Sequence, residues 1–466
     1  MGKISFGTEG YRGIIGYNFN FQVVERITKA IAEYIKQNKG KRLLVGYDTR
    51  FLSKEFAEHA ANTASKSEID VLISDEFCPS PVLSNATRSL MFNGGIMITA
   101  SHNPPKYNGI KFKSHYGGAV PTEVTDRLTE LISKTRVNNT LPEPYRKGID
   151  IKYIYKQDIE RFIDRRLHST KRLKIVVDPM YGSGQGLLAD IFKELGHEVI
   201  EINNTVNPYF GGINPEPIDE NLTQLKQAVL EHKADIGIAL DGDADRIALV
   251  NGMGEYVDAH RVFGLLIMYL VEDMGLTGGV AKTVSSTEMI NKLCEHYHLK
   301  LYITKIGFKH ICELMQRENV MIGGEESGGI GISSHIPERD GLLAGILVTQ
   351  MMLKRKKSLQ ELIELMYAIT GKYFYKRRDI YMENASRIYK LILNNKDRLL
   401  GNRDDYTIND MDGYKFEFKN GGFIMVRASG TEPVLRIYAE LNKKDEAEAM
   451  VNNFINKLKS IGGDKL

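Results

Sequence analysis

The stretch Gly95-Ile96-Met97-Ile98-Thr99-Ala100-Ser101-His102-Asn103-Pro104 contains a short apolar run followed directly by small and polar residues. A run this short and this apolar is typical of a buried strand, and the residues after it end the strand abruptly. Ser101 is therefore predicted to lie in a loop at the carboxyl end of a strand, where open α/β sheets bind their ligands.

The residues before Ser101 predict alternating strands and helices. Helices are expected near 21–36, 53–65 and 81–90, and strands at 43–47, 71–73 and 95–98. The order then recurs twice. Strands expected at 174–177, 198–202 and 236–240 lead to the polar segment 241–246, and strands at 279–281, 301–303 and 320–322 lead to the polar segment 323–329.

This recurrence of element order predicts three similar α/β domains with mixed, largely parallel sheets. The C-terminal residues differ, because 414–419 alternates with period two and Asn420-Gly421 is a strong hairpin turn. A closing amphipathic helix is expected at 447–458. The predicted domains are three α/β domains at 1–150, 151–255 and 256–370 and a small α+β domain at 371–466.

Composition limits the class of partner. The chain has 62 Lys and Arg against 59 Asp and Glu, a net charge of +3 that predicts no nucleic-acid partner. Its three cysteines, Cys78, Cys294 and Cys312, are widely spaced and favour a reduced, cytoplasmic protein in which they are small core residues. The N-terminus has no apolar signal core and no apolar run is long enough to span a bilayer, so no membrane partner is expected.

Asp241, Asp243 and Asp245 alternate with small residues directly after a predicted buried strand. Three carboxylates in this arrangement can converge on a hard cation such as Mg²⁺. An EF-hand is excluded, because Arg246 occupies the sixth position of such a loop and Gly252 the twelfth.

Two further loops have the residue types of a sugar-phosphate site. The segment Arg427-Ala428-Ser429-Gly430-Thr431 offers a guanidinium, two hydroxyls and unhindered backbone N–H groups, which suit a phosphate. The alternative is a turn that carries polar side chains without binding a ligand. Glu325 and Ser327 stand between glycine pairs and can hydrogen-bond the hydroxyls of a polyol, although glycine-flanked acidic turns are also common in proteins without such a ligand.

Ser101 does not fit a hydrolase, because no Gly-x-Ser-x-Gly pattern surrounds it and His102 is its sequence neighbour. A serine that carries a phosphoryl group fits better, since a phosphoserine beside three aspartates needs the cation that they bind. The segment 182–186 lacks Gly-x-Gly-x-x-Gly spacing and the chain has no P-loop, so dehydrogenase and kinase interpretations lose support.

Taken together and in this order, the four loops resemble those of the α-D-phosphohexomutase superfamily, the phosphoglucomutases and phosphomannomutases. The resemblance runs from Phe6-Gly7-Thr8 to Glu432-Pro433. It implies four domains around a central cleft, a phosphosugar substrate, Mg²⁺, and glucose 1,6-bisphosphate as activator. It also implies that hexose 1-phosphate and 6-phosphate interconvert through a phosphoserine and a bisphosphate intermediate.

The resemblance implies roles for individual positions. Ser101 resembles the phosphoserine, and together with its phosphate Asp241, Asp243 and Asp245 resemble the metal site. The basic positions near the phosphoserine are Arg12, His102, Lys111 and Arg246, of which Lys111 resembles a candidate for the acid/base role. The implied substrate-binding residues are Lys309, Glu325, Ser327, Arg427, Ser429, Gly430 and Thr431.

One loop departs from the pattern of this family. Many relatives have Gly-His after the sugar-binding serine, whereas here Gly328 is followed by Gly329. The acid/base or phosphate role of that histidine therefore has no counterpart at this position, and the resemblance does not transfer it to His335.

The sequence favours glucose phosphates as substrates, with mannose phosphates as a second possibility. Three alternatives stay open: a phosphoglucosamine mutase, an aspartyl-phosphate phosphatase, and a non-catalytic sugar-phosphate sensor. The phosphatase is considered because Asp241-x-Asp243 after a strand resembles the nucleophile and acid of that class, although Asp245 stands where that class usually has Thr or Val.

Overall fold

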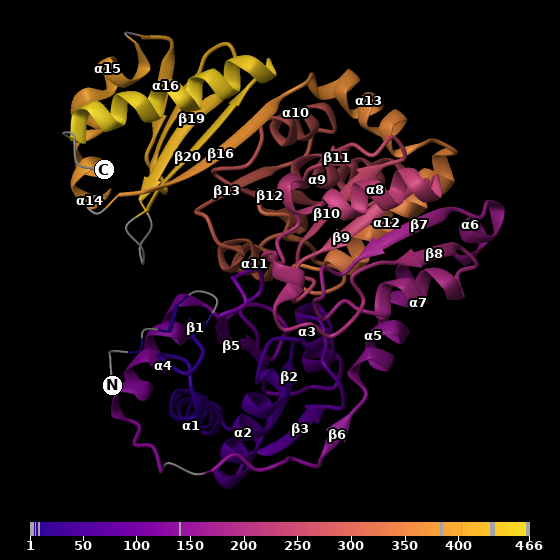
Figure 1. Ribbon diagram of the computed structural model, residues 1–466, viewed down its shortest axis with the longest axis vertical. Coiled ribbons are helices and arrows are strands. Elements are labelled where there is room, and N and C mark those ends of the chain that lie inside the picture. The colour runs from indigo at the N-terminus through magenta and orange to yellow at the C-terminus, as the bar shows by residue number, and fades with distance from the viewer. Residues whose placement is uncertain are drawn as a thin grey trace. The chain divides into compact units, whose positions relative to one another are not determined.

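The computed structural model of the chain describes residues 4, 6–7, 10–138, 141–382, 385–401, 403–428 and 434–462 (Figure 1). The chain divides into two compact units. The first comprises Met1–Ala281 with Gly307–Ile363, and the second comprises Lys282–Ile306 with Glu364–Leu466.

The first sheet has six strands in the order β1-β5-β4-β2-β3-β6. These are β1 (Tyr11–Ile14), β5 (Tyr107–Ser114), β4 (Gly94–Ile98), β2 (Arg42–Tyr47), β3 (Asp70–Ser74) and β6 (Gly148–Ile149). Strand β2 pairs in parallel with β3 and β4, whereas β5 runs antiparallel to both β4 and β1. The accompanying helices are α1 (Phe21–Gln37), α2 (Ser53–Lys66), α3 (Ser80–Ser89) and α4 (Thr122–Lys134).

The second sheet has the order β11-β10-β9-β7-β8. Its strands are β7 (Lys174–Asp178), β8 (Glu198–Glu201), β9 (Ile236–Leu240), β10 (Ile247–Asn251) and β11 (Tyr256–Val257). Strand β7 is parallel to β8 and β9, and β10 is antiparallel to β9. The helices are α5 (Ile151–Ile159), α6 (Arg165–Thr170), α7 (Leu187–Glu194) and α8 (Thr223–His232).

The third sheet has the order β13-β12-β14-β15. Its strands are β12 (Gly279–Thr283), β13 (Leu301–Thr304), β14 (Val320–Gly324) and β15 (Ile330–Ile332). The helices are α9 (Ala259–Met268), α10 (Met289–His296), α11 (Phe308–Arg317), α12 (Gly341–Arg355) and α13 (Leu359–Thr370).

The three sheets repeat one arrangement, in which a fourth strand returns antiparallel beside the third: β5 beside β4, β10 beside β9, and β15 beside β14. Each predicted polar loop is therefore the turn of a hairpin. The sequence pattern did not predict these return strands. In β5 the reason is that Lys111 and Lys113 are buried in ion pairs. Their charges make the sequence of this buried strand look like that of an exposed segment.

The fourth sheet is fully antiparallel and has the order β16-β20-β19-β18-β17. Its strands are β16 (Phe374–Tyr381), β17 (Tyr406–Asn409), β18 (Tyr414–Phe418), β19 (Phe423–Ala428) and β20 (Val434–Leu441). The helices α14 (Ala385–Leu391), α15 (Lys396–Leu400) and α16 (Lys444–Gly462) accompany it. Apolar residues of α16, among them Val451, Phe454 and Leu458, share one core with Phe416 and Ile437 of the sheet.

The predicted fold class is confirmed: three mixed α/β sheets precede a small antiparallel α+β sheet. The predicted helices and strands coincide with the observed ones to within a few residues. The domain boundaries at 150, 255 and 370 stay predictions. All three cysteines are buried and unpaired, as predicted. Within the described ranges, every helix is too short or too polar to cross a membrane.

Candidate active site

Ser101 lies in the loop between β4 and β5 with φ of 52°, in the left-handed region that few non-glycine residues adopt. The residue is only 1% exposed. Its Oγ donates a hydrogen bond to Asp241 Oδ2 at 2.8 Å, and His102 Nδ1 lies 3.5 Å from the same Oγ. A buried serine on a strained backbone, with its hydroxyl on a carboxylate, is typical of a functional position.

Arg50, which follows β2, fixes the backbone of this loop. Its guanidinium donates to four carbonyl oxygens, those of Ser101 (2.5 Å), Asn103 (2.7 Å), Tyr107 (3.0 Å) and Pro104 (3.1 Å). Its Nε lies 3.2 Å from Asp48 Oδ2, so the buried charge is paired. Five donors in a rigid fork make arginine suited to hold several acceptors at once.

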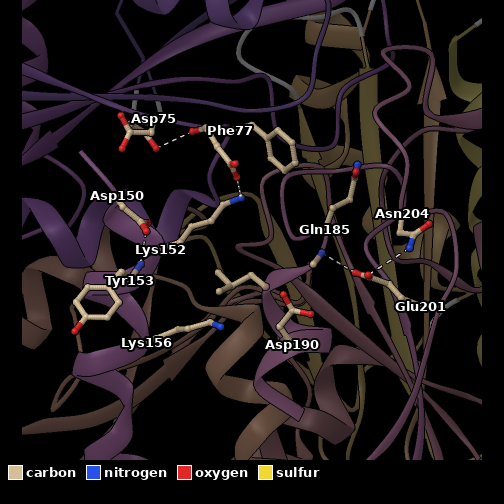
Figure 2. Close-up of a pocket in the computed structure, with 14 residues that line it drawn as sticks. Asp75, Phe77, Asp150, Lys152, Tyr153, Lys156, Gln185, Asp190, Glu201 and Asn204 are labelled. Atoms are coloured by element: carbon tan, nitrogen blue, oxygen red, sulfur yellow. Dashed lines mark hydrogen bonds and ion pairs between the residues drawn. The ribbon is translucent and has the colours of Figure 1, made fainter. Parts of the chain in front are cut away.

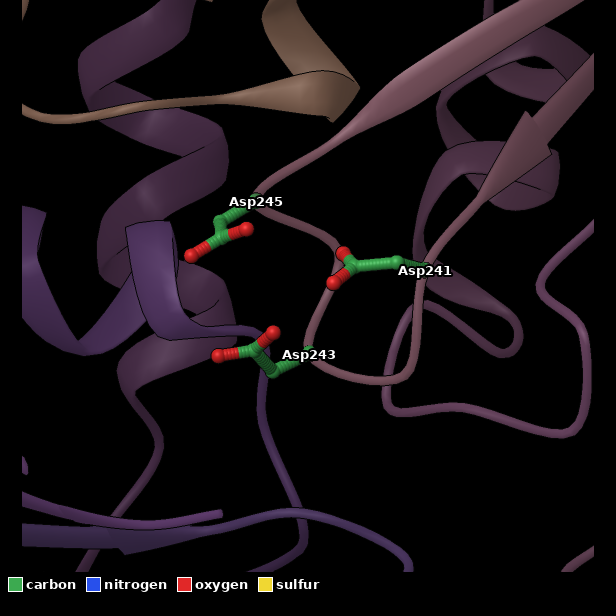
Figure 3. Close-up of side chains that lie close together, drawn as sticks. All are labelled: Asp241, Asp243 and Asp245. Carbon is green, nitrogen blue, oxygen red and sulfur yellow. The ribbon is translucent and has the colours of Figure 1, made fainter. Parts of the chain in front are cut away.

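Asp241, Asp243 and Asp245 lie in the loop between β9 and β10, and their carboxylates turn toward one another (Figure 3). All three are buried, and one oxygen of each lies within 4.8 Å of the others. In the described part of the chain, Asp243 Oδ1 and Asp245 Oδ1 accept no hydrogen bond although they are buried. Buried carboxylate oxygens without donors fit a small divalent cation, so this cluster is the candidate metal site.

Three basic side chains surround this cluster. Lys111 Nζ lies 2.7 Å from Asp243 Oδ2, Arg246 Nε lies 3.9 Å from Asp245 Oδ1, and Arg339 Nη2 lies 2.8 Å from Asp245 Oδ2. Three basic side chains therefore face the three carboxylates, and Arg246 and Arg339 are shared with further glutamates. A divalent cation together with a doubly charged phosphate on Ser101 adds no net charge, which removes the main electrostatic cost of burying both.

The aspartates respond differently to burial. Burial by itself raises the pKa of Asp243, but Lys111, Ser80 and Arg339 outweigh it and hold that pKa well below its usual range. The pKa of Asp241 is raised instead, first by burial and then by the neighbouring carboxylates.

The predicted sugar-binding loop between β14 and β15 is joined to the aspartate loop. Ile247 N–H donates to the carbonyl of Gly328 at 3.1 Å. Glu325 is buried; its Oε1 accepts from Gly307 N–H at 3.2 Å and its Oε2 lies 3.3 Å from Arg339 Nη1. Arg339 thus contacts carboxylates of both loops.

A separate pocket of about 710 Å³ lies elsewhere in the first unit and is lined by residues of α5, α7 and the end of β3 (Figure 2). Several of its charged groups already have protein partners: Lys152 pairs with Glu76 at 3.1 Å, and Asp150 accepts from Tyr153 N–H at 3.0 Å. None of the residues predicted for the site lines it, so the aspartate cluster is the better candidate.

Four family models cover nearly the whole chain. They are the phosphoglucomutase/phosphomannomutase α/β/α domains I, II and III, which match residues 3–139, 153–254 and 258–369, and the C-terminal domain, which matches 387–457. The chain belongs to the phosphoglucomutase/phosphomannomutase family. This phosphohexomutase is therefore an intramolecular phosphotransferase.

Relatives of this phosphohexomutase are named for different sugar phosphates. A phosphoglucomutase/phosphomannomutase of Thermococcus kodakarensis is 30% identical over 453 residues, which are 96% of each chain. A phosphoglucosamine mutase of Thermoanaerobacter pseudethanolicus is 30% identical over 462 residues, again 96% of each chain. A crystal structure assigned as a phosphomannomutase, from Thermus thermophilus, has a TM-score of 0.89 and 30% identity and covers 99% of this chain and 100% of that one.

Most of the predicted site residues of the phosphohexomutase lie together in the first unit: Ser101, His102, Lys111, the three aspartates, Arg246 and Glu325. Arg12 joins them through a 2.7 Å hydrogen bond from Nη1 to Asn103 Oδ1. Lys309 donates to Thr122 Oγ1 at 3.0 Å, and Ser327 is half-buried in the turn after Glu325.

The predicted phosphate loop belongs to the second unit. Arg427 lies at the end of β19, with its Nε 3.0 Å from Asp412 Oδ1. Ser429, Gly430 and Thr431 lie outside the described residues.

Sequence reasoning missed Arg50 and Arg339. Arg50 lies in the polar segment Asp48-Thr49-Arg50 after strand β2, and Arg339 lies in Glu338-Arg339-Asp340 before helix α12. An arginine beside an acidic residue at a strand end or a helix start is the signal that was available.

Proposed function

We propose that this phosphohexomutase interconverts hexose 1-phosphate and hexose 6-phosphate with Ser101 as the phosphoryl carrier, glucose being the preferred sugar and mannose a further one. The observation that carries the proposal is the buried Ser101 Oγ at 2.8 Å from Asp241, beside two aspartates with oxygens that accept no hydrogen bond in the described ranges.

The proposed chemistry uses a phosphorylated Ser101. A hydroxyl of the bound sugar monophosphate attacks the phosphorus, the new P–O bond to the sugar forms, and the bond to Ser101 Oγ breaks. The sugar hydroxyl gives up its proton to a basic side chain, and Oγ accepts a proton. After the bisphosphate has turned round, its other phosphoryl group returns to Ser101, and glucose 1,6-bisphosphate reloads an enzyme that has lost the group.

The surrounding residues position and neutralise the reacting groups, which is the main requirement of phosphoryl transfer. Lys111 is the proposed acid/base, while His102, Arg12 and Arg246 orient the phosphoryl group. Mg²⁺, bound by Asp241, Asp243 and Asp245, supplies positive charge at the transferring group when it is present. The remaining roles are contacts to the sugar by Lys309, Glu325 and Ser327, and to the non-reacting phosphate by Arg427, Ser429, Gly430 and Thr431.

A phosphoglucosamine mutase is the second candidate, because relatives with that name match this chain as closely as those named for glucose and mannose phosphates. The aspartyl-phosphate phosphatase has less support. Both oxygens of Asp241 already accept hydrogen bonds, from Ser101 Oγ and from Arg246 N–H, so its carboxylate is poorly placed to attack a substrate.

Rates with glucose, mannose and glucosamine phosphates, measured with Mg²⁺ and the matching bisphosphate, test the sugar preference. We expect the highest kcat/KM with glucose phosphates. Equal or greater activity with glucosamine phosphate would overturn that preference in favour of the second candidate.

Mass spectrometry of the enzyme after incubation with glucose 1,6-bisphosphate tests the carrier. We expect an acid-stable phosphate on Ser101, absent in Ser101→Ala together with the activity. Ser133→Ala, which removes an exposed serine of α4, is the control and keeps both. Retained mutase activity in Ser101→Ala contradicts the proposal.

A further inference from the structure

Gly329, in the turn between β14 and β15, has no room for a side chain. A Cβ built on it would lie 2.2 Å from Arg339 Cδ and 2.9 Å from Arg339 Cγ. Gly329 is not among the residues with positive φ, so its backbone conformation does not require glycine. The restriction is steric, and the stem of Arg339 imposes it.

The segment that carries Arg339 is held firmly against both loops. Asp340 N–H donates to the carbonyl of Ile330 at 2.8 Å, and Gly341 N–H donates to the carbonyl of Ala244 at 3.2 Å. Gly331 makes a second close approach possible, because a Cβ there would lie 2.5 Å from the carbonyl oxygen of Glu338. Arg339 is therefore placed by backbone contacts on either side of it.

Arg339 is only 3% exposed, and its guanidinium lies close to three carboxylates. Its Nη2 lies 2.8 Å from Asp245 Oδ2, its Nη1 3.3 Å from Glu325 Oε2, and its Nε 3.4 Å from Glu338 Oε1. One guanidinium is thus shared between the candidate metal cluster and the proposed sugar-reading carboxylate.

We propose that Arg339 is a positioning residue that fills the space beside Gly329 and couples the orientation of Glu325 to the aspartate cluster. Losing this guanidinium frees Glu325 to reorient and leaves the Asp245 carboxylate without the group that orients it. Both the sugar affinity and the cation affinity then change through one residue. The sugar part of this inference rests on the proposed function; the cation part does not.

A double-mutant cycle between positions 329 and 339 tests the inference. Arg339→Ala is expected to raise the Mg²⁺ dissociation constant and KM for the hexose phosphate, each by about 10- to 100-fold, the range found when groups that orient metal ligands are removed. Gly329→Ala is expected to have a similar effect by displacing the Arg339 stem. In the Arg339→Ala background the same change at 329 is expected to cost less than about threefold, because the obstructing atoms are gone.

Calorimetric titration of the whole chain with Mg²⁺ gives a readout that needs no turnover. If Gly329→Ala costs the same in both backgrounds, Arg339 does not restrict position 329 and the inference is overturned. If the effects of the two substitutions on the Mg²⁺ dissociation constant are non-additive but hexose phosphates are not converted, only the proposed function fails. If conversion occurs and the titrations are additive, only this inference fails.

Two further variants separate positioning from folding. Arg339→Lys keeps the charge but cannot reach both carboxylates; it is expected to unfold near the parent Tm while KM stays raised, and a KM equal to that of the parent contradicts the coupling. Arg355→Ala is the matched control, because Arg355 also pairs with two carboxylates, Glu272 and Asp273, away from the site. It is expected to lower Tm without changing KM or Mg²⁺ affinity.

Discussion

Each of the two units has a cluster of charged side chains, and one buried carboxylate in each, Asp243 and Glu440, responds to burial in the opposite way. The aspartate cluster of the first unit consists of Asp241, Asp243 and Asp245 with Lys111, Arg246 and Arg339. The second unit has a cluster of two lysines and two glutamates, namely Lys282, Glu288, Lys415 and Glu440. In this lysine–glutamate cluster, Lys415 Nζ lies 3.3 Å from Glu288 Oε1, and Glu440 Oε1 accepts from Glu288 N–H at 2.7 Å.

Burial favours the neutral form of two members of the lysine–glutamate cluster, Glu440 and Lys282. Burial raises the pKa of Glu440 to about 7 and lowers the pKa of Lys282 to about 8. In the aspartate cluster, by contrast, the pKa of Asp243 is held well below its usual range despite complete burial. Burial alone therefore does not mark a functional site. Negative charge that is kept when buried, on oxygens without donors, is what a cation site requires.

The largest expected effect comes from replacing Asp243 of the aspartate cluster by its amide. The corresponding replacement in the lysine–glutamate cluster serves as the control. Asp243→Asn removes a proposed metal ligand, and we expect kcat/KM to fall about 10²- to 10³-fold. In the parent, Mg²⁺ at about 100 times its dissociation constant should add about 2.7 kcal/mol to the free energy of unfolding. In Asp243→Asn this addition should be largely lost.

Glu440→Gln is the matched control for that experiment. Its amide oxygen can still accept from Glu288 N–H, and Glu440 is not one of the predicted site residues. We expect activity within about threefold of the parent and an unchanged Mg²⁺ effect on unfolding. If both amide variants lost activity equally, the distinction between the two clusters would fail.

A smaller effect is expected from Arg50, which orders the Ser101 loop through backbone carbonyls. Arg50→Lys keeps a charge beside Asp48 but cannot satisfy four carbonyl oxygens. We expect kcat/KM to fall about 10- to 100-fold, because a displacement near 1 Å at reacting groups costs that much. The extent of Ser101 phosphorylation by the bisphosphate measures the same displacement.

Arg42→Lys serves as the control for Arg50. Arg42 also donates to a backbone carbonyl, that of Leu90 at 2.8 Å, and begins the same strand β2. Little change in kcat/KM is expected for Arg42→Lys. An Arg50→Lys variant as active as Arg42→Lys would show that the loop keeps its shape without the guanidinium fork.

The sequence predicted what local patterns encode. The apolar runs before Ser101 and Asp241 marked buried strands correctly, and the alternation at 414–418 marked a strand of the antiparallel sheet. The return strand β5 was missed, because Lys111 and Lys113 look exposed in a pattern and become buried only through Asp243 and Glu338, far away in the chain. Arg50 and Arg339 were missed for the same reason, because their roles depend on contacts with other loops that are distant in the sequence.

The smallest effect that separates the two clusters is the pH dependence of stability. Because the pKa of Glu440 is about 7 in the folded chain and ordinarily near 4.5, folding favours its protonated form. Its contribution is complete below about pH 4.5 and is lost as the pH rises through 7, by at most about 1.4 kcal/mol per pH unit. Thermal unfolding of the parent and of Glu440→Gln, followed from pH 5 to 8 without Mg²⁺, should give similar Tm values at pH 5 and a higher Tm for the variant at pH 8. Parallel curves would mean that Glu440 stays ionised, and its carboxylate would then keep its charge when buried, as that of Asp243 does.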